Sequence, residues 1–125
     1  MNFKVKVSQI VQGDLNIQKN VKNVTKGTSF NSSEVSADPG DTVEYQILVS
    51  AVNNSVPNVF VKDALDPKLS LSGSVTLDGV IVSSSSFFSG FGVNIGTVGT
   101  GSNREIRFKA VVASRSQFTI GIFIL

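Results

Sequence analysis

Few side chains in this chain of 125 residues could carry out nucleophilic or acid–base chemistry. Cysteine, histidine and tryptophan are absent, which excludes thiol nucleophiles, imidazole bases and soft metal ligands. Carboxylates and lysines are the reactive side chains that remain as candidates. The aspartates that could meet in a loop cluster are Asp38, Asp41, Asp63 and Asp66. Their spacing follows no oxygen-ligand loop for calcium, so we predict no metal site, no cofactor and no enzymatic activity.

The overall charge and composition narrow the function classes further. The chain has 11 basic and 9 acidic side chains, a net charge of +2, which is far too balanced for a nucleic-acid-binding surface. Hydrophobic residues make up 41% and charged residues only 16%, so much of the surface must consist of small uncharged polar residues. This composition favours sheets over helices in a single domain with its own core.

Neither end of the sequence has the pattern of a membrane or targeting segment. Residues 1–12 alternate apolar and polar side chains and lack the continuous apolar stretch of a signal peptide. The apolar stretch at residues 118–125 is too short to span a bilayer and is rich in β-branched side chains. We therefore expect a buried strand there and no membrane-spanning segment.

Period-two alternation of apolar and polar residues recurs along the chain, with turn residues between the runs. The Asp78-Gly79 pair predicts a hairpin, whereas residues 26–38 and the serines that start at residue 83 predict loops. No segment has helical periodicity. The predicted strands lie near residues 3–7, 15–24, 43–50, 59–61, 75–77, 80–82, 93–95, 106–112 and 118–125. The pattern predicts an all-β, immunoglobulin-like two-sheet sandwich of about seven to nine strands.

Two central segments carry a resemblance to a known family. Residues 36–47 read SADPGDTVEYQI, which resembles the "pGDtvtYti" opening of a repeat domain common in bacterial and archaeal surface proteins. Residues 58–67 read NVFVKDALDP and resemble the "atnVvVtDtLP" strand of that domain, with one additional residue. The two motifs occur in the order that the family has.

Further motifs extend the resemblance over residues 15–113, although the turn after residue 99 lacks the proline that the family often has. The matching segments are VKNVT at 21–25, SGSVTLDG at 72–79, IGTVG at 95–99 and RFKAVV at 107–112. The resemblance implies an immunoglobulin-like sandwich that is repeated in tandem in stalks, adhesins or envelope proteins. It therefore implies a location at the cell surface or outside the cell.

Many members of this family carry a lysine near the first strand, an aspartate in the "vtDtLP" strand and an asparagine in the last strand, which together resemble an isopeptide-forming triad. By this resemblance Lys19 matches the lysine and Asp63 matches the acid. The stretch 118–125 contains no asparagine. One alignment places Gly121 at the asparagine position; the other, which we favour, has the sequence stop just short of it.

The opening residues NFKVKV resemble the missing piece, an asparagine followed by an alternating strand. We therefore divide the chain into a candidate donor strand, residues 1–13, and a sandwich domain, residues 14–125. In this hypothesis Phe3, Val5 and Val7 of one copy complete the sandwich of the next by strand addition. Asn2 is the candidate bond partner of Lys19 across the two copies.

Each candidate also has a plainer interpretation. Lys19 can be a solvated strand lysine, Asp63 a turn residue that hydrogen-bonds its own backbone, and Asn2 an ordinary chain end. Residues 87–91 supply three phenylalanines that form either an exposed adhesive tip or, the interpretation we favour, a plug at one end of the sandwich.

Taken together, the sequence predicts a structural module of the cell surface or extracellular space. We expect its partners to be copies of itself, in a head-to-tail fibre or envelope layer, or neighbouring repeat domains; nucleic acid is not among them. The alternative is a ligand- or carbohydrate-binding adhesin domain within a larger surface protein. That alternative is weakened because Trp is absent and the single Tyr, Tyr45, lies on a core-facing pattern.

Overall fold

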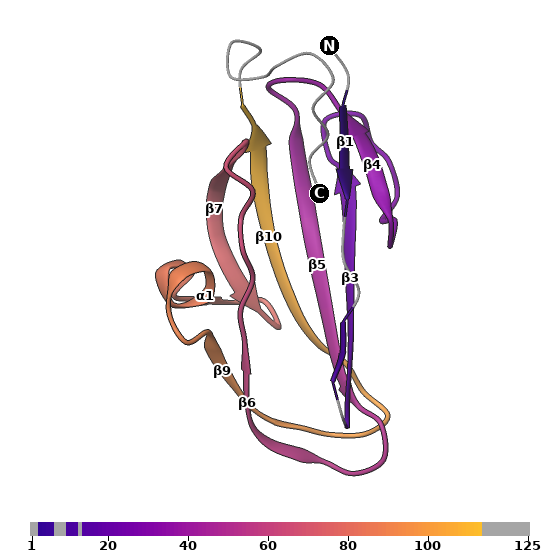
Figure 1. Ribbon diagram of the computed structural model, residues 1–125, viewed down its shortest axis with the longest axis vertical. Coiled ribbons are helices and arrows are strands. Elements are labelled where there is room, and N and C mark those ends of the chain that lie inside the picture. The colour runs from indigo at the N-terminus through magenta and orange to yellow at the C-terminus, as the bar shows by residue number, and fades with distance from the viewer. Residues whose placement is uncertain (1–2, 7–9, 13, 114–125) are drawn as a thin grey trace.

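The computed structural model describes residues 3–6, 10–12 and 14–113, which form three antiparallel sheets and one short helix (Figure 1). The largest sheet has six strands in the order β2 (Ile10–Gln12), β3 (Leu15–Asn23), β5 (Thr42–Ala51), β10 (Arg104–Val112), β7 (Leu69–Leu77) and β8 (Val80–Val82). The two smaller sheets are β1 (Phe3–Lys6) with β4 (Glu34–Ala37), and β6 (Val56–Val61) with β9 (Val93–Val98). Helix α1 (Ser84–Ser89) lies between β8 and β9 in the sequence.

Both small sheets lie over the same face of the large sheet. Side chains on the inner face of β3 contact both: Asn23 Nδ2 donates to the Ser36 carbonyl of β4 at 3.0 Å, and Lys19 pairs with Asp63 just beyond β6. This arrangement confirms the prediction of an all-β sandwich. Within the large sheet, β10, the last of the described strands in the chain, lies between β5 and β7.

Strand β5 sets the division between core and surface. Its residues alternate strictly between half-buried and buried, as expected for a strand with one face on a core. The aromatic ring of Tyr45 stacks on Phe108 of β10 with centroids 5.0 Å apart, and Phe108 in turn contacts Phe87 and Phe88 of α1 edge-on. These rings fill the core between the large sheet and α1.

The prediction of a loop over residues 26–38 is wrong in part, because β4 lies within it. Strand β4 is four residues long and pairs with β1 in the register Phe3 to Ala37. Val35 and Ala37 are buried in the common core. Such a short alternating segment carries a weak sequence signal, and it is the packing of these two side chains that makes it a strand.

The prediction of a low-complexity loop that starts at Ser83 is also wrong. Ser83 caps α1, since its hydroxyl accepts a hydrogen bond from the Ser86 amide at 3.2 Å. Phe87 is fully buried and anchors the helix to the core. A run of serines has no helical preference of its own, so the cap and the buried ring stabilise this single turn.

The predicted hairpin at Asp78-Gly79 is confirmed between β7 and β8. Both turn residues have positive φ, 48° and 86°, as a two-residue turn of the favoured hand requires. Asp78 also accepts hydrogen bonds from the Arg104 side chain and the Glu105 amide, at 2.6 and 2.9 Å. The hairpin is thereby tied to β10.

The predictions for residues 118–125 and Val7 lie outside the described residues. Within the described part, α1 falls well short of the length and apolar character needed to cross a membrane.

Candidate functional site

Lys19 occupies an inward position on β3 where a hydrophobic residue is expected. It lies opposite Ile47 of β5, which is 3% exposed, and directly opposed residues of antiparallel strands share a face. Its neighbours at the alternating positions, Ile17 and Val21, also belong to the core or pack on it. The interpretation of Lys19 as an ordinary solvated lysine therefore does not fit its place in the sheet.

Asp63 is the residue that compensates the charge of Lys19. Lys19 Nζ lies 2.6 Å from Asp63 Oδ2, and the two side chains are only 18% and 17% exposed. The pair bridges the large sheet and the end of β6. The structure thus brings together two of the three residues that the sequence placed in the triad.

Asp63 is held through its backbone and through its carboxylate. Its own backbone amide donates to the Phe87 carbonyl of α1 at 3.1 Å, and its Oδ1 accepts from the Ala64 amide at 2.8 Å. Oδ2 is buried and receives no aligned hydrogen bond from the described residues, so the Lys19 ammonium is its compensating group. Oδ1 thus makes the local hydrogen bond to the backbone that is expected of a turn aspartate, whereas Oδ2 points to Lys19.

Tyr45 completes the surroundings of the pair. Lys19 Nζ lies 4.8 Å from the centroid of its ring, within the range of a cation–π contact. Burial raises the pKa of the Tyr45 phenol, and the negative charges of Asp63 and Asp66 raise it further. The phenol therefore stays protonated, and Lys19 is enclosed by a neutral ring and one carboxylate.

This arrangement can support proton transfer between an amine and a carboxyl group in a partly dehydrated site. The amide side chains near Lys19 on β3 have other partners: Asn20 donates to Gln46 at 2.9 Å, and Asn23 donates to Asp41 at 2.9 Å. Asn2, the predicted third member, lies outside the described residues.

The candidate donor strand pairs with the chain's own β4. In this register Phe3 lies opposite Ala37 and Val5 opposite Val35. Because Asn23 contacts the neighbouring Ser36, Phe3 lies near the Asn23 end of β3, about 13 Å along the strand from Lys19 at ~3.3 Å per residue. A bond between Asn2 and Lys19 would therefore require the donor strand to lie elsewhere than on β4 in this register.

A second polar cluster lies at the other end of β3. Asp41 is 8% exposed, and its Oδ2 accepts from Asn23 at 2.9 Å and from the Asp38 amide at 3.0 Å, and lies 3.1 Å from Lys26 Nζ. Burial acts to raise the pKa of Asp41, but these hydrogen bonds and the Lys26 charge outweigh it and hold the pKa below 3.8, the ordinary value. Among the described residues, no three acidic groups come together as metal ligands.

We expect Asp41→Asn to flatten the dependence of the unfolding free energy on pH in the acid range. A carboxyl whose pKa is lowered by folding stabilises the folded state above its unfolded pKa, and this contribution is lost as the pH falls through the folded pKa. Urea unfolding at several pH values between about 2 and 5 measures the effect. Equal slopes in the two proteins would show that Asp41 contributes nothing to acid sensitivity.

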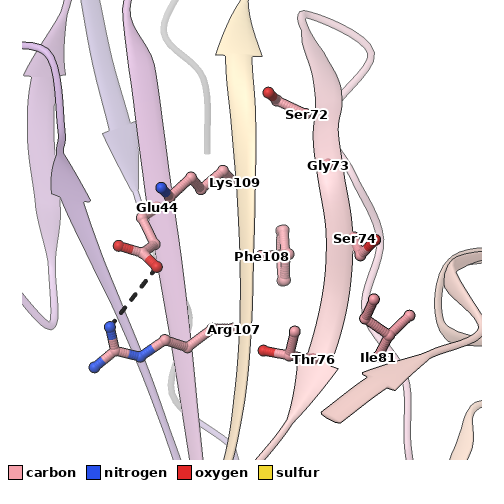
Figure 2. Close-up of a pocket in the computed structure, with 9 residues that line it drawn as sticks. All are labelled: Glu44, Ser72, Gly73, Ser74, Thr76, Ile81, Arg107, Phe108 and Lys109. Carbon is pink, nitrogen blue, oxygen red and sulfur yellow. Dashed lines mark ion pairs between the residues drawn. The ribbon is translucent and has the colours of Figure 1, made fainter. Parts of the chain in front are cut away.

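The outer face of the large sheet has polar features that the sequence analysis did not single out. A shallow groove over β5, β10 and β7 is shown in Figure 2, with Glu44 Oε2 paired to Arg107 Nη1 at 3.7 Å. Beside it, Gln46 donates to Glu105 at 2.6 Å. The alternation of apolar and polar residues could predict that these side chains point outward. Only the strand register shows which of them form hydrogen bonds or ion pairs with each other.

The phenylalanines of residues 87–91 divide between core and surface. Phe87 is fully buried and Phe88 is partly buried against the core, as the plug interpretation predicted, but Phe91 is 93% exposed. Phe60 on β6 is also exposed, at 54%. The groove of Figure 2 has no comparable ring, since its Phe108 is 2% exposed.

Fold and site together define a two-layer β-sandwich with a partly buried Lys–Asp pair between its layers. No protein-family model matches the chain, and no curated protein or solved structure matches it either. The resemblance to surface-protein repeat domains therefore stays a prediction from the motifs in the sequence.

Proposed function

We propose that this protein is a structural module of an extracellular or cell-surface assembly. The observation that supports this most directly is the Lys19–Asp63 pair, which joins β3 to the end of β6 across the core. A module that bears load needs specific contacts between its two layers, and this pair supplies one between side chains that are only 18% and 17% exposed. The motif resemblance to surface-protein repeats supports the same role.

Assembly proceeds head to tail through the N-terminal strand. Strand β1 is four residues long and pairs only with β4 among the described strands. Exchanging such a short strand between copies forms the same backbone hydrogen bonds that the single chain makes with itself, so the change in free energy is small. Because donor and acceptor are different parts of the surface, the contact is heterologous, and successive copies form a filament where the rotation between them does not close a ring.

A covalent bond is a second and separate way in which two copies can be linked. Lys19 first passes its ammonium proton to Asp63; the resulting amine attacks the carboxamide carbon of Asn2 from another copy, a C–N bond forms, and the bond from that carbon to the carboxamide nitrogen breaks, so that this nitrogen leaves as ammonia. Asp63, 2.6 Å from Lys19 Nζ, carries the proton from the attacking amine to the leaving nitrogen. This step needs the donor strand beside Lys19, so it is separate from strand exchange onto β4.

We expect the full chain to form oligomers whose size grows with concentration, and a chain that lacks residues 1–7 to remain monomeric. Light scattering after size-exclusion chromatography and electron microscopy measure this. A synthetic NFKVKV peptide should shorten the oligomers by capping the acceptor. A full chain that stays monomeric, or a shortened chain that assembles equally well, would refute strand exchange.

The covalent step has a separate measurement. Mass spectrometry of boiled, denatured oligomers should show linked chains that have lost one ammonia per link, and Lys19→Arg should remove the links. Monomer masses alone would refute the bond and leave strand exchange standing.

The alternative function, an adhesin domain, draws support from a different part of the molecule. The exposed rings of Phe91 and Phe60 belong to the loop before β9 and to β6. Exposed aromatic rings can stack on apolar ligand faces, but neither ring lies in the polar groove of Figure 2. We therefore retain the structural role as the main proposal.

A further inference from the structure

Strand β8 lies at one side of the large sheet and leaves its outer edge open. Within the described residues it pairs only with β7, with Ile81 opposite Thr76 and Val80 opposite Leu77. Val80 is 67% exposed and Ile81 is 69% exposed, and Ile81 lies on the outer face of the sheet, where it lines the groove of Figure 2. An exposed apolar edge strand is a site for pairing with another strand.

The hairpin determines which backbone groups of β8 face the open edge. In a two-residue hairpin the residues that flank the turn exchange both of their backbone hydrogen bonds, and the next opposed pair exchanges none. Leu77 and Val80 flank the turn between β7 and β8. The backbone amide and carbonyl of Ile81 therefore point away from β7, toward the open edge.

Most of the usual protections of an edge strand are missing from β8. Natural edges are blunted by charged side chains, proline, bulges, covering segments or short length. The sequence of β8 is Val-Ile-Val and its pairing with β7 is regular, whereas β1, with the sequence FKVK, carries a lysine at two of its four positions. Short length is the protection that β8 keeps, and it restricts which partner can use the edge.

The partner of such a short edge must be ordered before it binds. Only Ile81 presents both backbone groups outward, so a partner strand gains few hydrogen bonds. A flexible peptide would have to be ordered residue by residue, at an entropic cost that so few hydrogen bonds do not offset. A strand that already belongs to a folded domain avoids this cost. The partner must also be apolar opposite Ile81, because a polar group there would lose its hydration.

The β8 strand of a second copy meets both requirements. When two β8 strands pair antiparallel about a twofold axis, Ile81 of one copy lies directly opposite Ile81 of the other, and their outward amides and carbonyls form two reciprocal hydrogen bonds. Val80 of each copy then lies opposite Val82 of the other. Because Val-Ile-Val reads the same in both directions, every side chain of β8 meets an apolar one.

The charges near β8 do not oppose this contact. Residues 79–103 contain no charged side chain. Asp78, at the turn, is already paired with Arg104 Nε at 2.6 Å and accepts from the Glu105 amide at 2.9 Å. The segment that flanks the contact therefore brings no like charges together, which would otherwise disfavour the pairing of two identical surfaces.

We propose that β8 is a contact between two copies of this chain, in which their large sheets join edge to edge. The contact is isologous, so it closes after two copies. Its three residues per copy are far fewer than the roughly 20–30 per side of a standard interface, so an isolated pair is weak. In filaments built through β1 many such contacts act together and hold filaments side by side. That last step rests on the proposed head-to-tail assembly, whereas the pairing of β8 does not.

Symmetric disulfide formation tests the contact, because the chain has no cysteine of its own. In the paired strands the Cα atoms of the two Ile81 residues lie about 5.5 Å apart, within the range of a disulfide. Under mild oxidation we expect Ile81→Cys to form covalent dimers at least about tenfold faster than Val52→Cys. Val52 is the matched control, since it is an apolar side chain that is 53% exposed and lies outside β8.

A second pair of variants tests the register. A mixture of the Val80→Cys and Val82→Cys proteins should form mixed dimers, and Val80→Cys alone should form few, because position 80 of one copy lies opposite position 82 of the other. Equal rates for Ile81→Cys and Val52→Cys would overturn the proposal and leave the edge to a different partner. A Val80→Cys protein that cross-links with itself as fast as with Val82→Cys would overturn it too.

The reactions are run on the full chain with and without the NFKVKV peptide, which separates this contact from strand exchange through β1. Dimers of Ile81→Cys that form equally in both conditions support the β8 contact even if the chain does not assemble head to tail. Dimers that disappear with the peptide would show that the cross-link depends on strand exchange, and the independent contact proposed here would be wrong.

Discussion

We expect Phe108→Ala to lower the free energy of unfolding by about 4 kcal/mol, the middle of the range for buried aromatic truncations. Phe108 is 2% exposed and lies at the centre of the aromatic cluster. Its ring contacts Tyr45 at 5.0 Å, Phe88 at 5.1 Å and Phe87 at 5.6 Å between centroids. Truncation would leave a cavity and remove the contacts that hold α1 on the sheet.

Phe91→Ala is the matched control for this prediction. The same atoms are removed, but Phe91 is 93% exposed, so the change in the free energy of unfolding should stay within about 0.5 kcal/mol. Urea unfolding followed by circular dichroism measures both variants. Similar losses in the two variants would contradict the assignment of Phe108 to the centre of the core.

The second large effect is expected at the Lys–Asp pair. Lys19→Met should lower the free energy of unfolding by about 2 kcal/mol, less than the full cost of breaking a buried pair, because both side chains keep some exposure. The methionine preserves the apolar stem of the lysine but leaves the Asp63 charge in a site of low dielectric. The loss therefore measures the unpaired carboxylate rather than lost packing.

The double variant Lys19→Met with Asp63→Leu tests whether the lost stability comes from the unpaired Asp63 carboxylate. Removing both charges should recover most of the lost stability, because the desolvated carboxylate is gone as well. Lys22→Met is the control on the opposite face of β3, where Lys22 Nζ lies 3.4 Å from Glu44. That pair is more solvated on the lysine side, at 29% exposed, and should contribute less than about 1 kcal/mol.

A double variant as unstable as Lys19→Met alone would show that the loss does not come from an unpaired Asp63 carboxylate. The pair would then have no special role between the layers. Recovery of stability in the double variant would instead show that the fold does not need the ion pair. Lys19 and Asp63 would then be present for their chemistry, which favours the proposed bond with Asn2.

The alternation of apolar residues predicted the main strands well. Strands β5 and β10 follow clear period-two patterns, because one face of each packs on the core and the other faces solvent. Strand β3 alternates less regularly, because Lys19 and Asn23 occupy inward positions. The hairpin between β7 and β8 was also predictable, since Asp-Gly accommodates the positive φ values of a tight turn. These features depend on local geometry alone.

Strand β4 and helix α1 were not predictable from local pattern. Both are short, and each depends on side chains that meet residues far away in the sequence: Val35 and Ala37 pack into the common core, and Phe87 contacts Phe108. A weak local preference is easily outweighed by burial of this kind. The hydrogen bonds from Asn20 to Gln46 and from Gln46 to Glu105 could likewise not be predicted without the strand register.

The sequence by itself determined the all-β class, the inward face of the long strands and the identity of Lys19 and Asp63 as candidates, because residue type and period-two spacing are local properties. Only the tertiary structure decided that these two side chains lie 2.6 Å apart between the layers. Their separation of 44 positions in the chain (63 − 19) is closed because the segment after β6 that carries Asp63 reaches the inner face of β3. Such a contact depends on which sheets stack, and a pattern along one strand carries no information about that.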